Sequence, residues 1–265
     1  MSTIQAYTTA TRPSAVGNTG LTIFNTTTKN INVSDGTNWR AYVSDGSPLE
    51  ASSYSLKLDG TDDYVELGDV SFLSGASAFS VSLWVKAPAV TGSAETLFRS
   101  GGGSASNTIT AYQASSSLLF YIGNGSTYHG INSNGQHFAD AWLHLAFVYG
   151  SSSLSMYING SLQSTTTAGA STCPSSTVSN AGDDFTIGSY QNGASNELDG
   201  YIDDFAIFDS ALTSSEVSKI KNNAIYPTDK LRHLYKFENN FNDSIGNLDG
   251  TGFNQAQAST DTARP

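Results

Sequence analysis

The chain has 265 residues and a formal net charge of −11 at pH 7, and charged residues make up only 13% of it. Its 40 Ser, 27 Thr and 25 Gly favour short polar strands and turns over long helices. So acidic a chain lacks the basic face that nucleic-acid binding needs, and it contains no apolar run of the roughly 20 residues that span a membrane. We therefore expect a β-rich protein that binds no nucleic acid and inserts into no membrane.

The first 48 residues are polar, with three short runs that alternate apolar and polar residues: Leu21–Phe24, Ile31–Val33 and Trp39–Val43. Asp-Gly between such runs indicates a hairpin or a three-strand meander. Fewer than 50 residues with so few core candidates hardly fold alone. We expect a small β module over residues 1–48 that packs on the main domain, on another copy or on a partner.

Residues 49–254 repeat one pattern, in which a run of five to eight β-formers is followed by a Gly/Ser/Asn turn. Phe79–Val85 and Leu154–Ile158 alternate apolar and polar residues with period two, which indicates strands of an antiparallel sandwich. One short helix is predicted after Thr213, since Thr213 and Glu216 form a capping box. Pro227 then ends it.

The C-terminal part contains a further strand pattern, at about residues 231–237, and a stretch without apolar pattern, residues 255–265. We expect the latter to be an extended tail that reaches toward a neighbour. The single cysteine, Cys173, excludes an intramolecular disulfide and lies in a loop-like Ser/Thr stretch. The N-terminal residues have neither a basic region nor an apolar core, so we expect no secretory signal there.

Five motifs occur in one order between residues 54 and 222: Leu58–Leu67, Phe79–Val85, Trp142–Tyr149, Leu154–Gly160 and Leu198–Val217. Together they resemble the laminin-G-like domains of the concanavalin A type. The resemblance implies an all-β fold, an antiparallel two-sheet jelly-roll sandwich with one short helix beside the small N-terminal β module.

One motif is out of order. Leu234–Thr251 resembles a segment that normally opens these domains, yet here it follows the helix. Either the domain is circularly permuted or the segment is the shortened start of another copy. We favour permutation, with the strand at about 231–237 completing the sheet, because too few residues remain for a second sandwich. Completion within the same chain and a swap between chains both stay open.

The N-terminal module has a resemblance of its own. Arg12–Lys29 and Asp35–Trp39 are similar to a short element of phage tail and virion proteins. The resemblance implies a virion location, contacts with other virion proteins through residues 1–48, and a homo-oligomer, for which we expect a trimer.

Glycoside hydrolysis is an alternative function, because glycoside hydrolases occur on this type of sandwich. They need two carboxylates flanking the sugar bond. Glu197 and Asp199 lie two residues apart, which places both on one strand face and resembles the start of a hydrolase motif. The third acid of that motif is missing, because residue 202 is Ile and Asp203 points to the other face. We expect no catalytic residues and no enzyme activity.

Calcium is the cofactor that the resemblance implies. Related jelly rolls hold it with Asn and Asp side chains, and the matching positions here are Asp203, Asn240 and Asp243. The competing interpretation is that these acids and amides form Asx turns.

Sugar binding would use exposed aromatic rings that stack on pyranose faces, together with side chains that fix hydroxyl groups. The candidates in predicted loops are Tyr128, His129, Tyr190, Asn192 and Asn196. We expect adhesion of a bacteriophage virion appendage to a host-surface glycan. The alternatives are purely structural decoration of a capsid or tail, and a glycan hydrolase.

Overall fold

A computed structural model describes residues 5–8, 11, 13–25, 30–34, 39–42, 48–49, 52–102, 104–150, 152–179, 181–190, 193 and 195–263. The chain divides into two compact units, residues 1–51 with 218–226 and residues 52–217 with 227–265. Each is described separately below. No helix in the described part of the chain has the length and apolar character that a membrane span requires.

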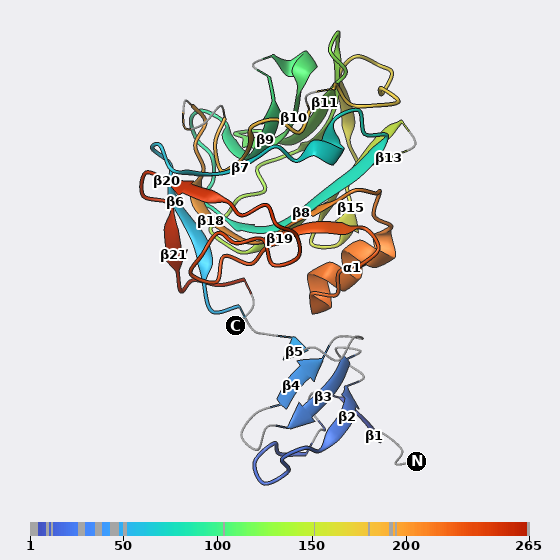
Figure 1. The fold of residues 1–265 in the computed structure, drawn as a ribbon, viewed down its shortest axis with the longest axis vertical. Helices are drawn as coiled ribbons and strands as arrows, with labels where there is room; N and C mark the ends of the chain where they lie inside the picture. Colours follow the sequence, from blue (N-terminus) through green and yellow to red (C-terminus); the bar gives the residue numbers. More distant parts are fainter. Residues whose placement is uncertain are drawn as a thin grey trace. The chain divides into compact units, whose positions relative to one another are not determined.

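The first unit contains a small sheet with the strand order β1-β2-β3-β4-β5 (Figure 1). Its strands are β1 (Gln5–Tyr7), β2 (Thr22–Asn25), β3 (Asn30–Ser34), β4 (Trp39–Tyr42) and β5 (Pro48–Leu49). Strands β2, β3 and β4 pair antiparallel in succession and match the predicted meander. Among the described residues of this small sheet, Ile23 is the buried large apolar side chain. This agrees with the small core expected from the sequence.

The second unit is a sandwich of two antiparallel sheets, which confirms the predicted fold class. The first sheet runs in the order β16 (Thr166–Gly169), β12 (Tyr128–Asn134), β11 (Ser117–Gly123), β10 (Thr108–Ala114), β9 (Glu95–Gly101), β17 (Phe185–Ile187), β7 (Tyr64–Gly68) and β20 (Thr251–Phe253). The second runs β15 (Ser161–Leu162), β14 (Ser153–Ile158), β13 (Leu143–Gly150), β8 (Ala78–Lys86), β18 (Asp199–Phe208), β6 (Ser55–Asp59) and β21 (Gln257–Ser259), and β19 (Leu231–Tyr235) pairs with β18.

Apolar residues that alternate along the strands fill the space between the two sheets. Phe98 of β9 lies at its centre, with ring centroids 5.6 Å from Phe147 and 6.0 Å from Phe205 of the opposite sheet. Its ring also stacks on Phe185 of the same sheet, at 5.8 Å. Rings this close add specific contacts to the burial of apolar area.

Local sequence signals form the elements they predicted. Ile158 and Ser161 pair across the Asn159-Gly160 turn, where both turn residues have the positive φ that this hairpin type requires. Helix α1 (Ser214–Asn223) begins with the predicted box, since the Thr213 N–H and hydroxyl both donate to the Glu216 carboxylate. Two short 3-10 helices, η1 (Ser71–Leu73) and η2 (Ala105–Asn107), lie in connections.

The C-terminal segments complete the sandwich. Strand β19 pairs antiparallel with β18, as expected for the strand at about 231–237. Residues expected in an extended tail instead provide β21, which pairs with β6, and Figure 1 shows β18, β6 and β21 side by side although they lie far apart in sequence. Lys86 and the Trp142 indole both donate to the Asp261 carboxylate, at 2.6 and 3.0 Å, and these bonds hold the segment after β21.

Candidate functional site

A row of tyrosines covers the outer face of the first sheet. Side chains alternate across a strand, so Ile109, Phe120 and Ile122 face the core, whereas Tyr112 and Tyr121 face outward. The ring centroids of Tyr112 and Tyr121 lie 6.1 Å apart, and those of Tyr121 and Tyr128 lie 5.3 Å apart. Three rings on three neighbouring strands therefore form one continuous surface.

Arg99 and Tyr190 extend this surface. Arg99 pairs with Thr110, which pairs with Tyr121, so the three side chains share the outer face. The Tyr190 ring lies over the Arg99 guanidinium, with 4.0 Å between Cζ and the ring centroid. We call Arg99, Tyr112, Tyr121, Tyr128 and Tyr190 the tyrosine face.

The tyrosine face is partly shielded from water. Burial raises the pKa of Tyr112, and the neighbouring phenols of Tyr128 and Tyr190 raise it further. Burial also raises the pKa of Tyr121 far above its usual range. The phenols of Tyr112 and Tyr121 are therefore neutral hydrogen-bonding groups at neutral pH.

At one end of the row Tyr128 is 36% exposed and borders a cavity of about 540 Å³. The other lining residues are small: Ser104–Ser106, Ser126, Thr127, Gly169 and Ala170. An exposed aromatic ring beside small polar side chains suits a ligand with one flat apolar face and several hydroxyl groups.

The other sugar-binding candidates have different places. His129, expected in a loop, lies in β12 on the side opposite Tyr128, where it is 7% exposed and its Nδ1 contacts the Ala170 carbonyl at 2.5 Å. It is not part of the tyrosine face. Asn196 lines another cavity, and Asn192 lies outside the described residues.

That other cavity, of about 610 Å³, is lined by Glu95, Asn196, Glu197 and Asp199 together with the 88–94 loop. Burial, together with the nearby Asp199 carboxylate, raises the pKa of Glu95 to about 7, against a hydrogen bond from the Asp199 backbone that lowers it. The structure thus adds Glu95 to the two acids singled out in the sequence.

Glu95 gives a pH-dependent prediction. A carboxyl group whose pKa is raised in the folded state binds its proton more tightly there, so folding loses stability as the pH rises from about 4.5 to about 7. Glu95→Gln removes this loss. We expect it to raise the free energy of unfolding by about 2 kcal/mol at pH 8 and to have little effect at pH 4.

Melting temperatures of the wild type and the variant between pH 4 and 8 measure this difference. Glu197→Gln, which removes another carboxylate from the same cavity, is the matched control. Parallel pH profiles of wild type and Glu95→Gln would contradict the prediction.

The three residues inferred for calcium each carry hydrogen bonds within the protein. Asp243 accepts bonds from the backbone N–H groups of Leu234 and Ile245 and from His233 Nδ1. Asn240 accepts from Asn242 N in an Asx turn, as in the competing interpretation, and Asp203 accepts from Ser52 and the Ala263 backbone. The Asn240 turn agrees with the competing interpretation, and calcium binding by these three residues stays a prediction.

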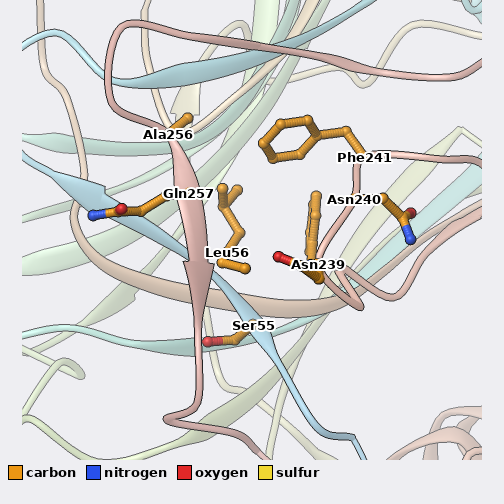
Figure 2. A pocket seen from close by; sticks show the side chains of 9 residues that line it. Ser55, Leu56, Asn239, Asn240, Phe241, Ala256 and Gln257 are labelled. Atoms are coloured by element: carbon orange, nitrogen blue, oxygen red, sulfur yellow. The ribbon is translucent and has the colours of Figure 1, made fainter.

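Asn240 also borders a smaller cavity of about 240 Å³ between β6, β21 and the loop at 237–241. Figure 2 shows that Leu56 and Phe241 point into it, whereas the amides of Asn240 and Gln257 are turned away. Both apolar and polar side chains line this cavity.

A closer group of carboxylates lies elsewhere. Oxygens of Asp59, Asp62 and Asp63 come within 4.8 Å of one another, in the turn between β6 and β7. Asp63 is buried, and its two oxygens accept the N–H groups of Asp59 and Gln255. Asp59 and Asp62 are exposed and can offer oxygens to a hard cation.

Comparison with known proteins agrees with this architecture. A family model described as the concanavalin A-like lectin/glucanases superfamily matches residues 59–218. The chain belongs to this superfamily. A search of curated protein sequences found no match.

Solved structures with this superfamily fold include a Bacteroides ovatus protein provisionally named as carbohydrate-binding, with 14% identity, TM-score 0.60, and coverage of 88% of this chain and 68% of that one. A heptameric SAP-like pentraxin from Limulus polyphemus has 15% identity, TM-score 0.51, and coverage of 79% and 96%. The enzymatically active domain of tailspike protein 2 of bacteriophage CBA120 has 14% identity, TM-score 0.53, and coverage of 69% and 30%. At these identities the likeness concerns the fold alone.

Proposed function

We propose that the protein binds carbohydrate without cleaving it and that the tyrosine face is the binding surface. The observation that carries the proposal is the unbroken row of Tyr112, Tyr121 and Tyr128 on the outer face of one sheet. Aromatic side chains offer large contact areas with an apolar face and a polar tip. Membership of a superfamily of lectins and glucanases supports the same conclusion.

The tyrosine face predicts which substitutions abolish binding. Tyr121→Ala and Tyr128→Ala should each weaken glycan binding about tenfold, since a central aromatic contact contributes on the order of 1–2 kcal/mol. Binding of the labelled protein to a glycan panel measures the effect. Tyr201→Ala, on the second sheet, is the matched control. Equal binding by all three variants would place the site elsewhere.

We further propose that the protein is an adhesive component of a bacteriophage virion, attached through residues 1–48 as a homo-oligomer. The motifs Arg12–Lys29 and Asp35–Trp39 support this proposal. Many copies on one particle would turn weak single contacts into firm attachment. The test is binding of the purified oligomer to candidate host cells. Absence of cell binding would favour a purely structural role in the particle.

Glycoside hydrolysis is the second candidate function, and the cavity with Glu95, Glu197 and Asp199 favours it. A carboxyl group with a pKa of about 7 can serve as a general acid. Release of reducing sugar that disappears in Glu95→Gln and Glu197→Gln would establish it. We expect no release.

We propose a structural calcium ion near Asp59 and Asp62. Two exposed carboxylates and neighbouring backbone carbonyls are the oxygen donors that calcium prefers. An ion that binds the native state alone stabilises it, so EDTA should lower the melting temperature by several degrees. Asp62→Asn should remove this effect, whereas Asp229→Asn, an exposed acid elsewhere, should preserve it. A melting temperature unaffected by EDTA would reject the ion.

A further inference from the structure

Arg99 is a buried cation in the tyrosine face. It is 4% exposed and lies in one row of side chains with Thr110 on one side and Thr186 on the other. The chain around it is strongly acidic, with a net charge of −11. Nevertheless, none of the ion pairs among the described residues includes Arg99.

The partners of Arg99 are neutral. Its two terminal nitrogens donate to the carbonyl oxygens of Gly101 and Gly102, and the Tyr190 ring covers its plane. Its Nε is buried and has no hydrogen-bond partner. The nearest acid in the same row is Glu66, which lies beyond Thr186. A buried charge is costly unless an opposite charge accompanies it.

A second buried atom on this face also lacks a partner, the side-chain Oδ1 of Asn132. Asn132 pairs with Leu119, which pairs with Tyr112, so its side chain shares the outer face with the tyrosines. Buried polar atoms are almost always hydrogen-bonded, and two exceptions on one surface call for a common explanation. A bound ligand that supplies an acceptor to Arg99 and a donor to Asn132 satisfies both.

The spacing limits the size of this ligand. Arg99 is on β9 and Asn132 on β12, three strands away, which corresponds to about 14 Å across the sheet. A sugar residue in an oligosaccharide extends about as far as one strand spacing, about 5 Å. Three residues thus reach from Arg99 to Asn132 and pass over Tyr112 and Tyr121.

We infer that the ligand of the tyrosine face is an acidic oligosaccharide, at least three residues long, whose anionic group pairs with Arg99. The inference rests on the proposed function and names the class of glycan. The anion is a carboxylate, sulfate or phosphate on the sugar. Since Tyr190 covers the guanidinium, its ring leaves this position when the anion enters. A hydroxyl group at the other end donates to Asn132.

The test compares each acidic glycan with a neutral counterpart. Tri-uronic acids are measured by calorimetry against their methyl esters, and sulfated and phosphorylated trisaccharides against the unmodified sugars, so that the arms separate the three anions. We expect at least one acidic member to bind ten times more tightly than its neutral counterpart. A net charge of −11 opposes acidic ligands in general, so such a preference requires a local cation.

Substitutions test whether Arg99 causes the preference for acidic glycans. Arg99→Gln should abolish the tenfold difference between the acidic member and its neutral counterpart, whereas Tyr190→Ala should keep the difference because the cation remains. Lys57→Gln, which removes an exposed cation from the second sheet, is the matched control. If Arg99→Gln does not fold, Arg99→Lys and the salt dependence of the wild type replace it. The preference should then weaken with added salt and persist in reduced form in Arg99→Lys.

A preference that survives in Arg99→Gln overturns the inference, and so does tighter binding of the neutral members. If acidic and neutral glycans bind the wild type equally and both bind Tyr121→Ala more weakly, this inference is refuted and the proposed function stays intact. Failure of every glycan to bind would refute both.

Discussion

Replacing Phe98 by alanine is expected to lower the free energy of unfolding by about 3–5 kcal/mol. The ring lies between the two sheets and contacts Phe147, Phe185 and Phe205. Alanine leaves a cavity that rigid strands on both sides cannot close, so the lost contacts add to the lost burial. Denaturant unfolding measures the change.

Two controls accompany this prediction. Phe98→Leu leaves a smaller cavity and should cost clearly less than alanine. Leu162→Ala, at a side chain that is 60% exposed, should change stability by no more than about 0.5 kcal/mol. If Phe98→Ala lowered the free energy of unfolding as little as Leu162→Ala, the Phe98 ring would not be packed between the two sheets.

Replacing Asp243 by alanine is expected to cost about 3–5 kcal/mol, although the residue lies in a loop. Its carboxylate is fully buried and accepts the N–H groups of Leu234 and Ile245 and the His233 ring. Alanine leaves these donors unpaired, and each unpaired buried donor costs about 1–3 kcal/mol. The melting temperature should fall by about 10 °C.

The same contacts determine the pH range in which the Asp243 carboxylate stabilises the fold. Burial alone would raise its pKa, but the hydrogen bonds from His233 and from backbone N–H groups outweigh burial and lower it. Stability from this group is therefore present above the ordinary carboxyl pKa and is lost as the pH falls through the lowered one. Asp243→Asn should become less harmful below about pH 4, and Asp229→Asn, at an exposed acid, is the matched control. A loss that stays constant down to pH 3 would contradict this assignment.

The two principal functional proposals are separable because they use different parts of the sandwich. Sugar binding depends on the outer face of the first sheet, whereas hydrolysis depends on the acid-lined cavity formed by the 88–94 loop and residues 195–199. Tyr121→Ala therefore tests the first without removing a carboxylate. Glu95→Gln tests the second without changing the tyrosine row.

Local signals predicted many elements correctly. The period-two pattern of Phe79–Val85 became β8, and the Thr213–Glu216 box begins α1, because pleat and helix cap depend on residues close in sequence. The same alternation carried an overlooked signal for the tyrosine face. Tyr112 and Tyr121 stand at positions opposite to the core residues of their strands, and an aromatic residue on the polar face of a strand is a candidate for ligand contact.

Other features could not be predicted from residues that are close together in the sequence. The sequence predicted His129 in a loop, yet its pairing with Ile122 places it in a strand. Gln257–Ser259 has no apolar pattern, but it becomes a strand because the edge of β6 offers free backbone partners. No pattern in the sequence predicted a role for Arg99. Only the structure shows that its charged side chain is buried among the neutral groups of Gly101, Gly102 and Tyr190.

The sequence by itself determined the fold class and the short helix, because these follow from periodicity, turns and caps within short stretches. Five motifs in one order carried the resemblance to the superfamily. Only the tertiary structure decided which side chains share a surface. Tyr112, Tyr121 and Tyr128 lie on three strands and Glu95 is far in sequence from Asp199, so their meeting depends on strand register. Register depends on pairing across the whole sheet, and burial, which sets the charge state of Glu95 and the isolation of Arg99, depends on that pairing in turn.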